Sequence, residues 1–411
     1  MAIAKAKQNY KLQTSTTSHV LGLGLTFGSI ILAIIQFFGK ALLTLILGSE
    51  GATVQTTSGS LDLTSTVVSS AWDYSRIRAY AAPLVVAGIM AQSVCLATLD
   101  TVMPALAVIA STVVNVIGDI WLVYFEGLGA RGAAVATAAA GLFSSIILLA
   151  SVRSKMKRWA HLGDKQEQLN PQSSTTIRHK TSTTHFISLP KSTDFINLAK
   201  LSGPIFIIML AKLICYSAMT IRASNFGMLD MACHSIMLRI FYFFCTFGDS
   251  LSQAVQSYLP TFIFGKSNAT NNNGQSMGTL FLKRMFALGG IFAIFNTLTS
   301  QLILQKMGSI FTTDIQILSL LRTPQYVFSV VVGLGLHPII MLLEGTIMAR
   351  GDLSFLMKSY GVIMILMLAQ IFIFSKSLSG VWYSLLTFQV LRFFSFAIRI
   401  WGRKNVESVA Q

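Results

Sequence analysis

The stretch VMPALAVIASTVVNVIGDIWLVYF, residues 102–125, decides the fold class of this chain. It is long enough to cross a bilayer as a helix. Its two strongly polar residues, Asn115 and Asp119, are four apart and share one helical face. A carboxylate inside the hydrocarbon layer is costly and usually faces a bundle interior or a wet cavity. The pattern predicts a proton or cation site, although a hydrogen bond that merely locks two helices together is the alternative.

The composition extends this interpretation to the whole chain. Of its 411 residues, 53% are hydrophobic and only 11% are charged, whereas about 25% are charged in soluble domains. We therefore predict an all-α, polytopic membrane protein embedded in a lipid bilayer. The net charge of +16 does not indicate a nucleic-acid partner, because the basic residues lie in loops and no aromatic-basic module surrounds them.

Two classes of function receive no support from the motifs. The four cysteines contain no C-x-x-C pair and lie in or beside apolar segments, which is typical of packing residues and not of disulfides or a metal site. P-loop, dinucleotide-binding and HExxH signatures are absent. The sequence thus predicts no enzyme, no cofactor and no metal. The cysteines are Cys95, Cys215, Cys233 and Cys245.

Ten apolar segments are predicted to span the membrane. They are 18–47, 78–98, 102–125, 131–152, 195–219, 229–263, 278–303, 323–346, 358–375 and 379–401. The polar stretch 153–193 has no apolar period and contains two prolines, so we predict a soluble linker there. This divides the chain into an N-terminal lobe of four helices (1–152), the linker (153–193), a C-terminal lobe of six helices (194–404) and a tail (405–411).

The basic residues set the orientation of these spans. Loops and ends on the side of the N-terminus carry most of the Lys and Arg, including the dense group within 153–193, while the opposite loops carry few. Because positively charged loops stay on the cytosolic or equivalent side, we expect both termini and the linker there.

Three segments in order resemble the multidrug and toxic compound extrusion (MATE) family. The first is APLVVAGIMAQSVCLATLDTVMPALAVIASTVVNVIGDIWLVYFEGLGARGAAVAT (82–137), similar to the fourth to sixth family helices. The second is ACHSIMLRIFYFFCTFGDSLSQAVQSYLP (232–260), similar to the eighth. The third is LLEGTIMARGDLSFL (342–356), similar to the tenth helix and the loop after it. Their phrasing resembles the plastid, DinF-like branch, which includes a chloroplast salicylate exporter.

The resemblance carries expectations beyond the residues themselves. It implies twelve helices in two lobes, and alternating access to a cleft between the lobes. The opening residues match the stretch after the second family helix, so the first two helices are expected to be missing and the chain to be a fragment. A monomer in the plastid envelope is implied as well.

Within that resemblance, Asn115 and Asp119 match the fifth-helix N-x-x-x-D associated with coupling to H⁺ or Na⁺. Lys212, in the middle of an apolar segment, needs a carboxylate partner, a wet cavity or an anionic substrate. Direct contact with a substrate anion and a structural ion pair both remain open. Glu344 matches an acid of the tenth helix and either binds substrate, relays a proton or makes an interface bond.

One further segment supplies polar candidates for the substrate cleft. Asp249 and Gln253 are one helical turn apart in GDSLSQAVQ, and Arg239 and His234 precede them. A lone histidine is more often a packing residue, so His234 has that alternative.

Other charged residues are expected to fix loops. Asp100, Arg350 and Asp352 lie in short turns between spans, where we expect them to hold the turns and not to contact substrate.

The predicted function is an antiporter that exports a small organic solute by using a proton or sodium gradient. Lys212 favours an organic anion, such as an aromatic carboxylate, over a cation. A flippase for lipid-linked precursors and a non-transporting relic remain alternatives. The first would favour basic over acidic cleft residues, and the second follows from the expected loss of two helices.

Overall fold

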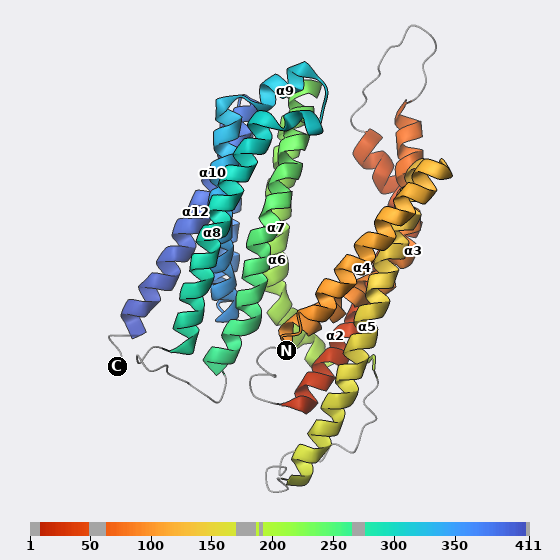
Figure 1. Cartoon of the computed structure of the whole chain (residues 1–411), viewed down its shortest axis with the longest axis vertical. Coiled ribbons are helices and arrows are strands. Elements are labelled where there is room, and N and C mark those ends of the chain that lie inside the picture. The colour runs from red at the N-terminus through yellow and green to blue at the C-terminus, as the bar shows by residue number, and fades with distance from the viewer. Residues whose placement is uncertain (1–8, 49–62, 170–185, 189–191, 265–275, 408–411) are drawn as a thin grey trace. The chain divides into compact units, whose positions relative to one another are not determined.

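The computed structural model describes residues 9–48, 63–169, 186–188, 192–264 and 276–407, and these residues are overwhelmingly helical (Figure 1). Within these described ranges, ten helices are long and apolar enough to cross a membrane, which confirms the predicted all-α, multi-pass membrane protein. The elements are α2 Tyr10–Gly48, α3 Leu63–Ala97, α4 Val102–Asp119, η1 Ile120–Phe125, α5 Gly129–Leu169, α6 Ser192–Ser224, α7 Met228–Phe264, α8 Met277–Lys306, η3 Gly308–Ile310, α9 Ile315–Leu321, α10 Pro324–Ala349, α11 Leu353–Ala369, η4 Gln370–Phe374 and α12 Leu378–Glu407.

The chain divides into two units, Met1–Thr193 and Asp194–Gln411. In the N-terminal unit, α3 packs on α2 and α5, and α5 also packs on α4. The helix α4 is the least buried of the ten spans, so most of its apolar surface is exposed within this unit. Asp100 fixes its start, because Oδ1 accepts hydrogen bonds from the amides of Val102 and Met103.

The end of α5 differs from the sequence-based prediction. We predicted a linker without apolar period from residue 153, but the helix continues to Leu169. Val152, Met156 and Trp159 recur at helical spacing and are buried together with Leu21 of α2. The apolar stripe is narrow and is interrupted in the sequence by many charged residues of the outer face, so the apolar period is hard to recognise from the sequence. Of the remaining predicted linker, residues 170–185 and 189–191 lie outside the described residues.

The helix α10 forms the centre of the C-terminal unit. It packs against α7, α8 and α12 and is the most buried of the ten spans. Gly345 permits the close crossing with α7, because a Cβ there would lie 2.9 Å from the backbone oxygen of Ser252. Gly248 of α7 does the same for His337, whose Cδ2 would lie 2.7 Å from a Cβ. Two glycines thus bring α7 and α10 together where both carry polar residues.

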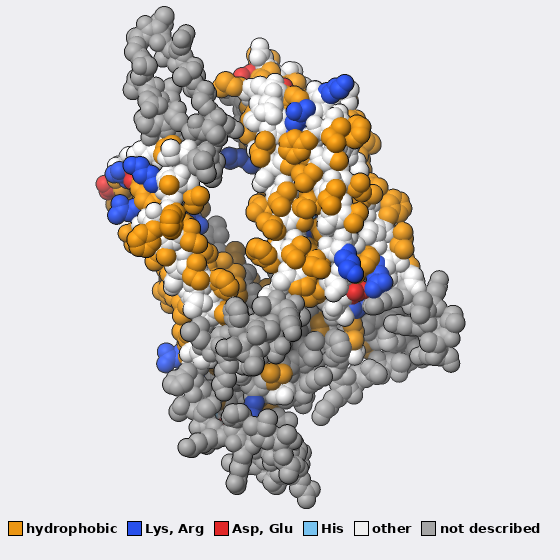
Figure 2. Space-filling view, turned by 180° about the vertical axis from the view of Figure 1, so that it is seen from behind, with side chains coloured by type: hydrophobic (Ala, Val, Ile, Leu, Met, Phe, Trp, Pro, Cys, Tyr) orange, Lys and Arg blue, Asp and Glu red, His pale blue; other side chains and the backbone are white. Residues whose placement is uncertain are grey.

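The surface is that of a membrane protein. Hydrophobic side chains cover the visible faces of the described helices, and Lys and Arg gather toward helix ends in this view (Figure 2). Large exposed apolar residues include Ile109, Ile117, Leu213, Ile294 and Ile365, a pattern that suits contact with lipid tails. All four cysteines are buried and free, as expected of packing residues.

Candidate functional site

In the N-terminal unit, the predicted pair Asn115 and Asp119 forms a hydrogen bond within α4. Asn115 Nδ2 donates to Asp119 Oδ2 over 3.1 Å. The second oxygen, Oδ1, is buried and has no hydrogen-bond partner among the described residues. Gly118 lies against Ala136 of α5, so this part of α4 faces its neighbour helix. The sequence-based pairing of these residues on one face agrees with the geometry, and their ion-coupling role stays a prediction.

Asn115 also lines a cavity inside the same unit. The cavity has a volume of about 640 Å³ and is bounded by α2, α3, α4 and α5. Its wall is mostly alanine, valine and isoleucine, with Arg78, Thr112 and Thr137 as further polar contributors. Asp119 does not line this cavity, but Asn115 does. Because the amide of Asn115 donates to the Asp119 carboxylate, Asn115 lies between that carboxylate and the cavity.

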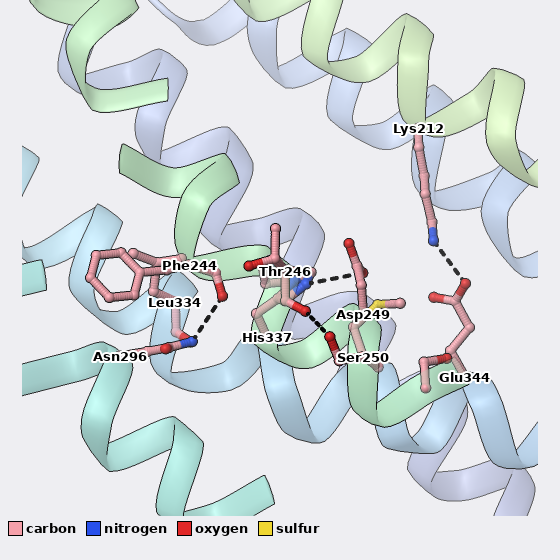
Figure 3. Close-up of polar contacts among 12 residues, drawn as sticks. Lys212, Phe244, Thr246, Asp249, Ser250, Asn296, Leu334, His337 and Glu344 are labelled. Carbon is pink, nitrogen blue, oxygen red and sulfur yellow. Dashed lines mark hydrogen bonds and ion pairs between the residues drawn. The ribbon is translucent and has the colours of Figure 1, made fainter. Parts of the chain in front are cut away.

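In the C-terminal unit, Lys212 and Glu344 form an ion pair between α6 and α10. Lys212 Nζ lies 2.7 Å from Glu344 Oε1 (Figure 3). Only 3% of the Glu344 side chain is exposed, against 18% of Lys212. The ammonium also lies 5.2 Å from the centre of the Tyr360 ring, a cation–π distance. Of the two partners, Lys212 has the more exposed side chain.

The other oxygen of Glu344 has two donors of its own. Arg392 Nη2 of α12 lies 2.7 Å from Oε2, and the hydroxyl of Tyr360 on α11 donates to the same atom over 2.5 Å. Glu344 is thus a buried carboxylate whose two oxygens are both engaged by donors. This geometry supports an interface bond at Glu344 over direct contact with substrate.

A chain of polar groups continues from Arg392 to the surface of the unit. Arg392 Nη1 donates to Gln389 Oε1 at 2.8 Å, and Gln389 Nε2 lies 3.3 Å from His337 Nδ1. His337 Nε2 in turn lies 3.6 Å from Asp249 Oδ1, and half of the Asp249 side chain is exposed (Figure 3). The network therefore links a half-exposed acid on α7 to the buried carboxylate on α10.

The centre of this network carries excess positive charge. Lys212 and Arg392 contribute two cations, and Glu344 contributes one anion. Aromatic rings surround the guanidinium, with the ring centres of Phe388 and Tyr360 at 5.1 and 5.3 Å from Arg392 Cζ, and cation–π contacts offset part of the cost of burial. The cluster favours an additional negative charge at the more exposed cation, Lys212.

The remaining candidates on α7 divide into exposed and buried residues. Arg239 and Gln253 are exposed and lie two heptads apart, hence on one helical face, with the exposed Thr246 between them. His234 was considered for the cleft, but it is fully buried. Its Nε2 lies 3.3 Å from Thr220 Oγ1, and its ring centre lies 5.6 Å from that of Trp382. The packing alternative therefore describes His234, and the cleft assignment is corrected.

The loop acids hold turns, as anticipated. Asp100 Oδ2 pairs with Lys155 Nζ at 2.5 Å, and Asp352 Oδ2 pairs with Arg399 Nε at 2.8 Å. Arg350 forms the C-cap position of α10.

Several known proteins resemble this chain in fold or in sequence. No protein-family model matches the chain. A MOP superfamily transporter from Pyrococcus furiosus superposes with a TM-score of 0.71 at 16% identity, covering 100% of this chain and 82% of that chain. The MATE transporter VcmN of Vibrio cholerae in its bent form gives 0.66 at 16% identity, covering 97% and 82%. At this identity the likeness shows the fold.

Two proteins from Arabidopsis thaliana are similar to this chain in sequence. DETOXIFICATION 47, chloroplastic, is 27% identical over 396 residues, covering 96% of this chain. DETOXIFICATION 44, chloroplastic, is 25% identical over 334 residues, covering 80%. The chain therefore resembles MATE transporters in fold and the chloroplastic DETOXIFICATION proteins in sequence. It spans 65% of the length of the first of these two relatives and 57% of the second.

Sequence reasoning missed four of the seven residues of the network in the C-terminal unit. His337, Tyr360, Gln389 and Arg392 were not singled out, although Arg392 stands alone among apolar residues in LTFQVLRFFSF (386–396). An ionisable residue within a span is by default a functional or paired group, so Arg392 was detectable as a partner in search of a carboxylate.

Proposed function

We propose that this MATE-like chain forms the transport unit of a secondary active antiporter that exports an organic anion by alternating access. The observation that carries the proposal is the cluster of Lys212, Arg392 and Glu344, which places two cations and one carboxylate inside membrane-spanning helices. Asp249, the other acid of the network, is half exposed and lies at its far end, so the positive charge around Glu344 is only partly balanced, which is costly within a membrane. A bound anion at Lys212 would offset it.

The three partners of Glu344 explain how Lys212 could serve an anion. If Lys212 turns from Glu344 to a substrate, the carboxylate keeps the bonds from Arg392 and Tyr360. Neither charge is then left uncompensated, which is the expensive outcome for buried ion pairs. The rings of Tyr216 and Tyr242, 5.4 Å apart, lie on the same two helices, α6 and α7, as Lys212 and Asp249. They support an aromatic anion as the substrate class.

Coupling to a gradient is assigned to the N-terminal unit. The unpaired Oδ1 of Asp119 can accept H⁺ or Na⁺, with Asn115 holding the other oxygen. Neutralising a carboxylate in the membrane changes its cost of burial and its hydrogen bonds. This difference biases the population toward one conformation over the other.

The test is solute flux in proteoliposomes that contain the full chain. Benzenesulfonate is a suitable probe because its permanent charge prevents leakage as a neutral acid, and benzyltrimethylammonium is the cationic comparator. We expect gradient-driven flux of the sulfonate only, and at least tenfold less in Lys212→Gln. Lys376→Gln, an exposed lysine outside the spans, is the matched control with unchanged flux. Flux of the cation alone, or equal flux in Lys212→Gln, contradicts the proposal.

A flippase for lipid-linked precursors is the second candidate, because Arg239 is exposed within the α7 span and is a third basic residue within the spans of this unit beside Lys212 and Arg392. A scrambling assay with a fluorescent polyprenyl phosphate separates the two functions. Residence in the plastid envelope is proposed on the likeness to the chloroplastic relatives, and the monomeric state stays a prediction.

A further inference from the structure

A groove between α11 and α12 lies apart from the polar network. It has a volume of about 370 Å³, and its walls include Val362 and Leu366 of α11 and Leu391 of α12. Val362 and Leu366 are 59% and 50% exposed. Both helices are candidate membrane spans, so the groove opens within the depth of the bilayer.

One end of the groove is polar. Lys358 lines it and is exposed, and no ion-pair partner for it is found among the described residues. Asp352, an acid near Lys358 in the sequence, forms its ion pair with Arg399. Ser395 Oγ, also in the lining, donates a hydrogen bond of 3.2 Å to Ser359 Oγ, which leaves the Ser359 hydroxyl able to donate and both oxygens able to accept.

The depth of these groups fits a lipid molecule. Lys358 follows the first residue of α11 by five positions, which at 1.5 Å per residue is about 7.5 Å from the end of the span. Leu366 lies about 12 Å further along the helix. A lysine at this depth extends to the headgroup level, and the groove beyond it occupies the acyl region.

We propose that this groove binds an anionic phospholipid. Lys358 pairs with the phosphate, Ser359 and Ser395 hydrogen-bond the headgroup or glycerol oxygens, and one acyl chain lies along Val362 and Leu366. The end that carries Lys358 belongs to the side on which most basic loop residues fall. Basic residues at that surface attract anionic lipids with about 1 kcal/mol each.

The experiment uses the full purified chain in a neutral detergent. Binding of dioleoyl phosphatidylglycerol and dioleoyl phosphatidylcholine is compared by native mass spectrometry, with glycerol 3-phosphate as the probe for a free phosphate. We expect phosphatidylglycerol to bind in preference, and Lys358→Gln to reduce that preference about fivefold, the loss of one basic residue. Lys283→Gln, an exposed lysine on α8 outside this groove, is the matched control.

A second variant tests the groove itself. Val362→Trp fills it and should abolish the preference for phosphatidylglycerol, whereas Ile365→Trp, at an exposed position of the same helix outside the lining, should not. Equal binding of both lipids, displacement by glycerol 3-phosphate, or equal losses in Lys358→Gln and Lys283→Gln would overturn the proposal. If Val362→Trp does not fold, the comparison of Lys358→Gln with Lys283→Gln still tests the proposal.

Discussion

Lys212 and Glu344 are 132 residues apart in sequence, yet their 2.7 Å ion pair joins α6 to α10 inside the C-terminal unit. The pair is asymmetric. Glu344 is nearly sealed and holds two further donors, whereas Lys212 is partly exposed. The carboxylate therefore acts as the fixed member of the pair, and the ammonium as the movable one.

This asymmetry predicts unequal losses of stability. Glu344→Gln leaves the buried Arg392 and the partly exposed Lys212 without their counter-charge, and removal of one partner of a buried pair typically costs about 3–5 kcal/mol. Lys212→Met leaves Glu344 bound by Arg392 and Tyr360 and should cost less. Thermal unfolding in detergent, followed by tryptophan fluorescence, should rank the melting temperatures as wild type, Lys212→Met, Glu344→Gln. The reverse order of the two variants would show that Glu344 is not the shared centre.

The close crossing of α7 and α10 predicts sensitivity at Gly345. In Gly345→Ala the new Cβ meets backbone atoms of Ser252 at 2.9 and 3.0 Å, and overpacking of this kind costs about 1–3 kcal/mol. Gly290→Ala on α8 meets nothing within 4 Å and should be neutral or stabilising by up to about 1 kcal/mol. Chemical denaturation of both variants provides the measurement, and equal midpoints would argue against a tight crossing.

The turn before α4 predicts a loss of stability in acid. Burial alone would raise the pKa of Asp100, but the hydrogen bonds from Lys155 and the Met103 amide and the charge of Lys155 hold that pKa below its usual value. A lowered folded-state pKa contributes stability above about pH 4, and this is lost as the pH falls through the folded-state value.

The matching variant is Asp100→Asn, which keeps a cap acceptor but removes the charge. We expect its melting temperature to fall less than that of the wild type between pH 6 and pH 3. Asp314→Asn, at the N-cap of α9, is the control and should follow the wild-type profile. A steeper acid dependence in Asp100→Asn would contradict the ion pair.

The unpaired oxygen of Asp119 predicts a coupling phenotype. Asp119→Asn should fold, because the amide can still accept from Asn115, but efflux should no longer respond to an imposed H⁺ or Na⁺ gradient. Asn115→Ala should weaken the response without abolishing it. Flux measurements with each gradient applied alone also identify the ion, and a wild-type response in Asp119→Asn would remove this carboxylate from the mechanism.

The spans were predictable from sequence because apolar length is a local property. All ten were found, whereas the end of α5 was misjudged since Met156 and Trp159 form a narrow stripe among charged residues. The same-face placement of Asn115 and Asp119 followed from helical spacing alone.

The partners of Glu344 were not predictable in the same way. An ion pair across 132 residues leaves no periodic trace, so the sequence allowed both a substrate contact and a structural bond for Lys212. Arg392 and Tyr360 come from two other helices and act on one oxygen. Tertiary packing brings these side chains from separate helices to one carboxylate. The local pattern of a single sequence does not show which helices will meet.

The shared carboxylate also constrains the biogenesis of the protein. Synthesis delivers Lys212 first, Glu344 132 residues later and Arg392 a further 48 residues on. An ionisable side chain near the centre of an inserting helix carries a penalty of about 2.5–3.5 kcal/mol. The insertion penalty of Lys212 on α6 is therefore offset only after α10 has been synthesised, and that of Glu344 on α10 is fully offset only after α12. Membrane integration of this half is consequently a collective step, completed only when α12 has left the ribosome.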